Sequence, residues 1–196
     1  MDKDNRTDKY QERYVAYHKI RRHLSDDKPP RYKSRERLSF ENIMRGRRSQ
    51  RVFNKDPLTS VEIFKLYGAA NLAPSSCNRR GVSIVLVRDD KLKKGIAESL
   101  VGGMGWIDTA DCILLLLADM VAYKSPAEVD YMPYLDAGVI SQNILLMAES
   151  LGIGACFVNP NLLKDKKGDF NIFTSGRRFC GAIALGHYDR REVKKG

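Results

Sequence analysis

Apolar residues follow two different periods along this chain, and the periods separate its helices from its strands. Residues Thr59–Glu62 read as a capping box, and the apolar positions from Ile63 to Ala70 then recur at helical spacing. Val82–Val87 is instead a short, mostly apolar run typical of a strand, and Ile113–Leu117 is continuously apolar. The second run shows no alternation, which is expected for a central strand that is covered on both faces.

The longest apolar pattern covers Tyr134–Leu151 and is apolar on nearly every side of the helix that it predicts. A surface helix of a monomer would keep a polar face, so this helix is either the core helix or part of a dimer interface. The remaining expected elements are a helix that starts at Ser39, a helix over Lys91–Val101, a loop at Gly102–Gly105, and strands at Cys156–Val158 and Cys180–Leu185.

Residues 1–37 differ from the rest of the chain because they are charged and poor in aliphatic side chains. Tyr10 to Leu24 could form one short amphipathic helix, and Pro29-Pro30 would end it. We therefore divide the chain into a charged N-terminal extension, 1–37, and one domain, 38–196. A nucleic-acid arm is the alternative interpretation of the extension, but its acidic residues and the lack of any DNA or RNA motif argue against it.

The formal net charge of +10 indicates an anionic partner, and about half of the excess lies within residues 1–40. A phosphorylated cofactor and a phosphorylated reductant would account for the remainder. Four widely spaced cysteines, without a C-x-x-C pair, are expected to be buried and reduced rather than paired or metal-bound. We found no signal peptide and no apolar run long enough to cross a bilayer, so we expect a cytoplasmic protein without membrane association.

Arg47-Arg48-Ser49-Gln50-Arg51 places three guanidinium groups and a hydroxyl group within five residues, directly after Gly46. In an extended backbone Arg47, Ser49 and Arg51 would point to one side and form an array of donors that suits a phosphate dianion. A solvated basic turn is the alternative for such a run taken alone.

Three motifs in order resemble the FMN-dependent nitroreductase family. They are the basic run that ends in Arg51-Val52-Phe53, the turn Ala73-Pro74-Ser75-Ser76-Cys77-Asn78, and the helix that begins with Asp136-Ala137-Gly138 and ends in Leu151-Gly152-Ile153-Gly154. The resemblance covers about residues 38 to 188. It implies an α+β fold, a three-layer sandwich with a mostly antiparallel central sheet flanked by helices, assembled as a homodimer.

The resemblance also assigns cofactor-binding roles. Arg47, Arg48, Ser49 and Arg51 would hold the phosphate, the ribityl chain and the pyrimidine edge of FMN. Pro74, Ser75, Ser76 and Asn78 would reach the flavin of the second subunit, although Ser75 and Ser76 could merely cap a turn and Asn78 could satisfy its own backbone. Val158 and Asn159 would lie beside the ring, and Arg190 would contact the phosphate.

Two departures from the family pattern are visible. Pro160 stands near the place where relatives offer a backbone N–H to flavin N5, and proline has none. Either Asn159 or a shifted loop residue such as Asn161 would serve instead, or the flavin is tuned differently. Relatives also continue past the last strand with a basic residue and an arm around the partner. Here we expect Arg190, Arg191, Lys194 or Lys195 to reach the phosphate, and no exchanged arm.

The expected function is an oxidoreductase that uses FMN to pass hydride from NADH or NADPH to a small oxidised acceptor, such as a nitroaromatic or a quinone, in a ping-pong cycle. The flavin carries this chemistry, so we assign no catalytic side chain and no metal ligand. Arg79 and Arg80 are expected to be a solvated pair, with contact to an anionic reductant as the alternative. The alternative functions are a dehalogenase, dehydrogenase or flavin-remodelling enzyme of the same fold, and a non-catalytic flavin- or anion-binding protein.

Overall fold

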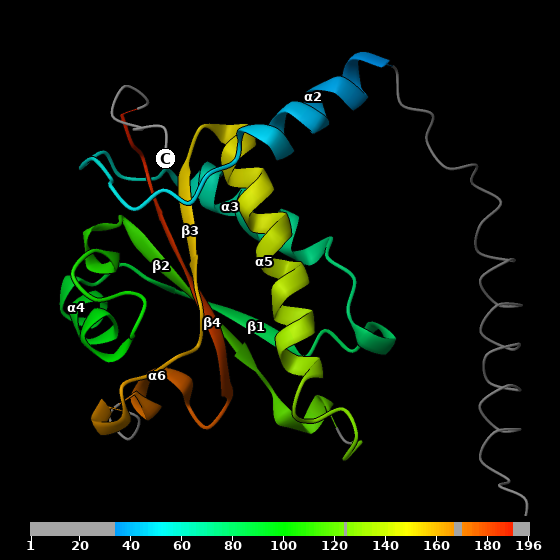
Figure 1. Cartoon of the computed structure of the whole chain (residues 1–196), viewed down its shortest axis with the longest axis vertical. Coiled ribbons are helices and arrows are strands. Elements are labelled where there is room, and N and C mark those ends of the chain that lie inside the picture. Colours follow the sequence, from blue (N-terminus) through cyan, green and yellow to red (C-terminus); the bar gives the residue numbers. More distant parts are fainter. Residues whose placement is uncertain (1–33, 124, 167–169, 190–196) are drawn as a thin grey trace, which may run out of the picture. The chain divides into compact units, whose positions relative to one another are not determined.

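The computed structural model describes residues 34–123, 125–166 and 170–189, and the described residues from Glu41 onward form one compact unit (Figure 1). The helix expected near Tyr10 to Leu24 and the basic residues from Arg190 onward lie outside the described residues.

Four strands form a single antiparallel sheet within the described residues, in the order β1-β2-β4-β3 (Figure 1). Their bounds are Val82–Val87 for β1, Cys112–Ala118 for β2, Gly154–Val158 for β3 and Arg178–Gly186 for β4. All four predicted strand positions are therefore confirmed, and β4 begins two residues earlier than expected.

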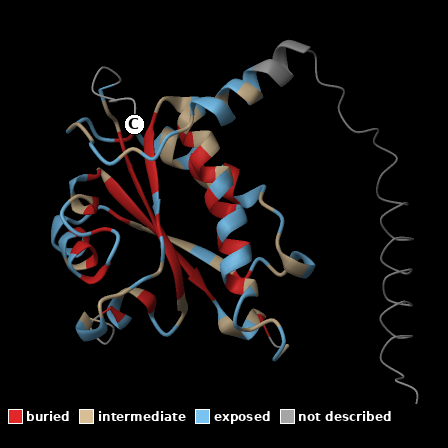
Figure 2. Ribbon diagram, in the orientation of Figure 1, coloured by how far each residue is buried: buried red, intermediate tan, exposed pale blue. Residues whose placement is uncertain are grey.

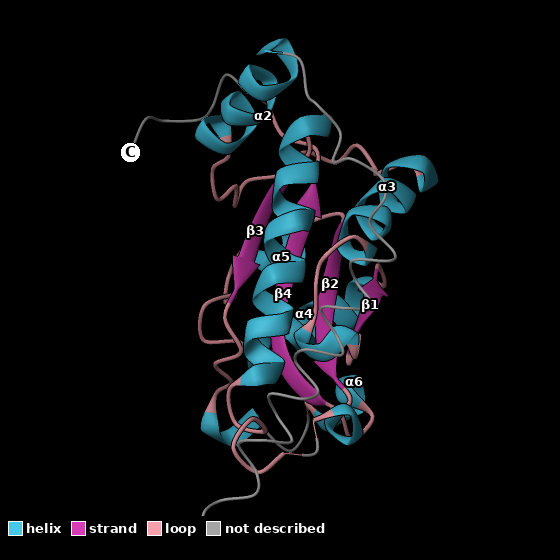
Figure 3. Ribbon diagram, turned by 90° about the vertical axis from the view of Figure 1, so that its right-hand side faces the viewer, coloured by secondary structure: helices cyan, strands magenta, loops and turns pink. Residues whose placement is uncertain are grey.

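Helices cover both faces of this sheet. The helices are α2 (Ser34–Gly46), α3 (Ser60–Asn71), α4 (Asp90–Ser99), α5 (Met132–Leu151) and α6 (Asn171–Thr174). Helices α3 and α5 lie on one face, and α4 and α6 lie on the other (Figures 1 and 3). The structure thus has the predicted α+β architecture of three layers.

The start of helix α2 was predicted wrongly. It begins at Ser34 rather than at Ser39. Arg35 and Glu36 favour helical conformation, so the turn that precedes the expected capping serine is itself helical.

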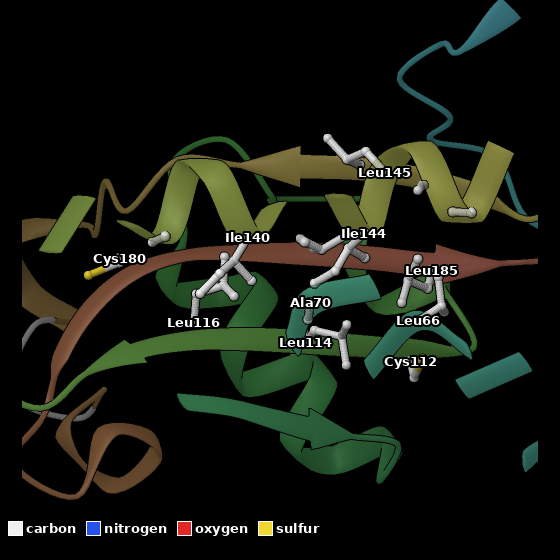
Figure 4. Close-up of a cluster of buried hydrophobic side chains, with 14 of the residues drawn as sticks. Leu66, Ala70, Cys112, Leu114, Leu116, Ile140, Ile144, Leu145, Cys180 and Leu185 are labelled. Atoms are coloured by element: carbon white, nitrogen blue, oxygen red, sulfur yellow. The ribbon is translucent and has the colours of Figure 1, made fainter. Parts of the chain in front are cut away.

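Strand β2 supplies alternate side chains to the two cores of the sandwich, and every one of its residues is buried (Figure 2). Leu114 and Leu116 pack under α3 and α5, against Ile140 and Ile144 (Figure 4). The residues between them on the strand point to the layer of α4 and α6. This double burial explains why β2 has a continuous apolar run.

The register between β2 and β4 shifts beside Gly181, because Leu116 pairs with Gly181 and Leu117 with Phe179, which leaves Cys180 as the extra residue. Gly181 has φ of +141°, and a Cβ atom there would come within 2.6 Å of the Phe157 ring. A side chain is therefore excluded at this position.

Helix α5 combines the two alternatives that the sequence left open. One face is buried against the sheet through Ala137, Ile144 and Ala148. The other leaves Leu135 56% and Val139 40% exposed, so α5 is a core helix that also presents an apolar surface. Figure 2 shows buried and exposed stretches alternating along α5. No helix within the described residues has both the length and the apolar character that crossing a bilayer requires.

Candidate functional site

The basic segment, Arg47–Arg51, leaves α2 in an extended conformation and runs parallel to β3. Arg47 N–H donates to the last turn of the helix, to the carbonyl oxygen of Ile43, at 3.0 Å. Ser49 then forms an isolated bridge with Ala155 of β3, and Gln50 N–H donates to the Ala155 carbonyl oxygen at 3.0 Å. Two chain segments about a hundred residues apart are thus fixed side by side by backbone contacts.

Ser49 and Arg51 lie on the same side of the basic segment, as alternation in an extended chain requires. Both side chains lie near the sulfur of Cys156, a strand residue that is only 1% exposed. Burial raises the pKa of the Cys156 thiol, while the charges of Arg51 and Arg47 and the polar groups of Ser49 and Arg51 oppose this rise. The positive charges of Arg47 and Arg51 therefore act together at this place in β3.

Arg48 is engaged differently. Its guanidinium group donates to the carbonyl oxygens of Arg45 and Arg47, at 2.7 and 2.9 Å, and so completes the C-terminal end of α2. A cavity of about 230 Å³ is lined by Arg47, Arg48 and Gln50 of the basic segment, and α5 contributes Leu145 and Glu149 to it. The carboxylate of Glu149 makes this cavity less suited to an anion than the Cys156 side is.

The loop before β2 meets the basic segment at Trp106. The Arg51 guanidinium carbon lies 5.7 Å from the centre of the Trp106 ring, and Trp106 Nε1–H donates to the Gly102 carbonyl oxygen at 3.0 Å. A Cβ on Gly102 would lie 3.4 Å from a methyl group of Val158 and 3.9 Å from Oδ1 of Asn159. The fold thus places the predicted residues Arg51, Val158 and Asn159 around one loop.

Trp106 and Cys156 are members of this neighbourhood that sequence reasoning missed. Trp106 is the only tryptophan in the chain and follows a glycine-rich loop, which could have drawn attention to it. Cys156 had no such signal. Asn159 is exposed, and its side-chain oxygen accepts from Asn161 N–H at 3.4 Å. Arg190 lies outside the described residues.

The second candidate element is the 74–78 turn, Pro74–Asn78, which connects α3 to β1. It contains the short 3₁₀ helix Ser76–Asn78, in which Cys77 and Asn78 have left-handed φ angles of 51° and 54°. The side chain of Ser75 accepts from Arg80 N–H at 3.0 Å. Cys77 and Asn78 are both exposed, which corrects the expectation that all four cysteines are buried.

A buried carboxylate anchors this turn. Asp136 of α5 is 5% exposed and accepts from Ser76 N–H at 2.9 Å and from the Tyr123 hydroxyl group at 2.8 Å. Burial, the hydrogen bond to Asp136 and its negative charge raise the pKa of Tyr123, so this hydroxyl stays protonated and donates.

An ion pair fixes Arg79, the residue directly after the turn. Arg79 pairs with Glu128 at 2.7 Å, which raises the pKa of the guanidinium group further. The expectation of a solvated Arg79 is therefore wrong, because a carboxylate 49 residues away in the sequence folds against it. Neither Glu128 nor the anchoring role of Asp136 was predicted.

The 74–78 turn and the basic segment lie at opposite ends of α5. Asp136, in the second turn of the helix, holds the turn, whereas Glu149, near its end, lines the cavity beside Arg47. The two α5 residues are about 20 Å apart along the helix axis. Figure 3 shows α5 lying lengthwise over the sheet. Within one chain, the two elements are therefore separated by most of the length of α5.

No cluster of three or more His, Cys, Asp or Glu side chains suited to a metal ion occurs in the described parts of the chain. His187 contacts Glu62, with Nε2 3.6 Å from the carboxylate oxygen.

Comparisons with known proteins agree with this architecture. The chain matches the nitroreductase family over residues 44–105 and 100–187. It is 32% identical over 171 residues to FMN reductase [NAD(P)H] of Bacillus subtilis, which covers 76% of this chain and 65% of the relative. It is also 32% identical over 112 residues to a putative NADH dehydrogenase/NAD(P)H nitroreductase of Archaeoglobus fulgidus, which covers 57% of this chain and 62% of the relative. The chain thus spans less than two thirds of the length of either curated relative.

Solved structures show the same fold. A putative nitroreductase from Desulfovibrio desulfuricans, in complex with FMN, superposes with a TM-score of 0.66 at 23% identity, over 80% of this chain and 90% of that one. At this identity the likeness establishes the fold alone. The family match, by contrast, includes the basic segment, the 74–78 turn and α5. On this evidence the chain belongs to the nitroreductase family.

Proposed function

We propose that this chain binds FMN beside the basic segment and uses it to oxidise NADH or NADPH and to reduce a small acceptor such as a nitroaromatic or a quinone. The observation that carries the proposal is the clustering of Arg47, Ser49 and Arg51 on an extended segment that backbone contacts hold against β3. The names of the two curated relatives support the flavin and both reductants.

The donor set fits a phosphorylated flavin. Among the described residues, neither Arg47 nor Arg51 forms an ion pair with a carboxylate, so both guanidinium groups remain able to bind an anion. Guanidinium groups bind phosphate in a bidentate manner, and the Ser49 hydroxyl adds a neutral donor. When bound, FMN supplies the hydride chemistry, and the chain has only to bind and orient it.

The other predicted residues would enclose the ring. Val158 offers a buried apolar side chain at the end of β3, and Asn159 follows it as an exposed amide. Since Pro160 has no N–H to donate, we assign the polar contact near flavin N5 to Asn159, with Asn161 as the alternative. Trp106 would orient Arg51 toward the cofactor by stacking against its guanidinium group.

We further propose that the site is shared within a homodimer. Asp136, which holds the turn, and Glu149, which lies beside the basic segment, are about 20 Å apart along α5, so we assign the turn to a flavin that another chain holds. A twofold axis that packs α5 antiparallel to its partner would bring the turn of one chain to the basic segment of the other. Each dimer would then hold two equivalent flavins.

The exposed apolar side chains support this assembly. Leu135 and Val139 of α5 are joined on α3 by Phe64, which is 77% exposed. Burial of apolar surface contributes about 25 cal/mol per Å², so covering such faces on two chains favours a stable dimer. All four cysteines are free, which suits a reducing compartment, and we propose that the protein works in the cytoplasm.

The test is a spectroscopic and kinetic one. We expect the purified full-length chain, after incubation with FMN and gel filtration, to keep a flavin absorption band and to lose it when NADH or NADPH is added without oxygen. Addition of a quinone or a nitroaromatic should restore the band. A chain that keeps no flavin would contradict the proposal, and bound flavin that neither nucleotide reduces would contradict the oxidoreductase activity.

A further inference from the structure

Asp136 stands out among the polar groups of the structure because it is buried and yet bonds to a segment sixty residues away. Its two oxygens accept separate hydrogen bonds, one from the backbone N–H of Ser76 and one from the hydroxyl group of Tyr123. Tyr123 is itself only 2% exposed. A buried carboxylate is costly unless such partners are present, so this arrangement fixes all three groups in one geometry.

The 74–78 turn, which Asp136 holds through Ser76, has an unfavourable backbone conformation. Cys77, Asn78 and Arg80 all have left-handed φ angles, of 51°, 54° and 51°, although none of them is glycine. Such residues keep these angles only when surrounding contacts impose them. Besides Asp136, the contacts here are the bond from Arg80 N–H to Ser75 and the ion pair of Arg79 with Glu128.

We propose that Asp136 is a positioning residue, which acts through the 74–78 turn on the flavin bound by the partner subunit. This inference rests on the proposed function. Asp136 does not contact the cofactor in this scheme. It holds Ser76, and hence Pro74, Ser75 and Asn78, in the conformation in which they meet the flavin, and a rigid turn loses less freedom when the ligand binds.

The first arm of the test compares two substitutions of nearly the same shape. In Asp136→Leu both acceptors are lost, and we expect the dissociation constant of FMN to rise about tenfold. In Asp136→Asn the amide oxygen can still accept from Ser76 N–H, so the affinity should return to within about threefold of wild type. Equal affinity of Asp136→Leu and wild type would overturn the proposal.

Asn143→Ala is the matched control on the same helix. The Asn143 side chain donates to the carbonyl oxygen of Ala69 at 3.1 Å and therefore ties α5 to α3 rather than to the turn. This variant should lower the melting temperature without changing FMN affinity. An equal loss of FMN affinity in Asn143→Ala and Asp136→Leu would show that Asp136 acts only through general stability, and would overturn the proposal.

The second arm tests action across the interface. Asp136→Leu and Arg51→Ala chains, with different affinity tags, are co-expressed, and the mixed dimer is isolated by both tags. In this dimer one site combines the intact basic segment of the Asp136→Leu chain with the intact turn of the other chain. We therefore expect one FMN per dimer with the wild-type dissociation constant, although neither homodimer has such a site.

The outcomes also separate this inference from the proposed function. A mixed dimer without any site of wild-type affinity would overturn the proposal that Asp136 acts in the partner's site. Wild-type protein that binds no FMN would instead refute the proposed function, before Asp136 is considered. If wild type binds FMN, Arg51→Ala weakens it and Asp136→Leu does not, the proposed function stands and only the role of Asp136 is refuted.

Discussion

The basic segment and the 74–78 turn are proposed to meet the same flavin, yet the fold holds them in different ways. Backbone contacts with β3 fix the basic segment, so Arg47, Ser49 and Arg51 keep their side-chain donors for a ligand. The turn is fixed by side chains, above all by the buried carboxylate of Asp136. One element supplies charge and the other supplies a fixed shape, and substitutions should separate the two contributions.

The largest expected effect comes from removing charge from the basic segment. Arg51→Ala should raise the dissociation constant of FMN at least tenfold, because a charge-assisted contact with phosphate contributes about 1.5 to 3 kcal/mol. Arg47→Ala should behave alike, and neither should change the melting temperature of the apoprotein much. Fluorescence titration of the apoprotein measures this. Unchanged affinity in both variants would exclude the basic segment from the site.

Substitutions that loosen the turn should lower the stability of the apoprotein, unlike substitutions in the basic segment. Tyr123→Phe leaves one oxygen of Asp136 without its hydrogen bond, and a buried group in this state costs about 1 to 3 kcal/mol of the free energy of unfolding. Tyr131→Phe is the control, because Tyr131 is half exposed and its change should stay within about 0.5 kcal/mol. Urea denaturation of both variants gives the values. Equal stability of the two variants would show that the Tyr123 bond does not hold the turn.

A pH experiment extends the comparison to the thiols. Burial raises the pKa of Cys112 to about 12, and the charge of Asp111 adds to this, whereas Arg51 and Arg47 limit the rise at Cys156. The folded chain keeps the Cys112 proton to higher pH than the unfolded chain does, so the stabilising contribution is complete below the ordinary thiol pKa. It is lost as the pH rises from about 9 toward 12.

Cys112→Ala should therefore reduce the alkaline loss of stability by about 1 kcal/mol at pH 10, and Cys156→Ala should reduce it by less. Denaturation at pH 8 and pH 10 measures both. The exposed Cys77 provides the control, because Cys77→Ala should lose as much stability as wild type. If Cys156→Ala reduced the alkaline loss of stability more than Cys112→Ala does, Arg51 and Arg47 would not limit the rise in the Cys156 pKa as described.

The smallest expected effect concerns the stacking of Arg51 on Trp106. A cation–π contact of this kind contributes about 0.5 to 1 kcal/mol at an exposed position, so Trp106→Ala should weaken FMN binding by about two- to fivefold. In wild type, the fluorescence of this single tryptophan should be quenched when FMN binds. A tryptophan signal that FMN does not alter would place the flavin away from the loop.

The two regions also differ in how far the sequence predicted them. The donors of the basic segment are neighbours in the chain, so Arg47, Ser49 and Arg51 could be grouped from the sequence alone. The strands were predictable because double burial requires continuous apolar runs, as at β2. The turn was recognised only by its resemblance to the family. Its anchor was not predictable, because the pairing of Ser76 with Asp136 depends on how the chain folds back on itself.

The central claim is that one flavin site is assembled from two chains, and native mass spectrometry tests it directly. A dilution series of the FMN-loaded protein should show both dimers and monomers, and the mass of each species gives its flavin content. We predict up to two FMN molecules on the dimer and none on the monomer, because a single chain cannot bring the turn and the basic segment together. A monomer that retains FMN as well as the dimer does would contradict the shared site.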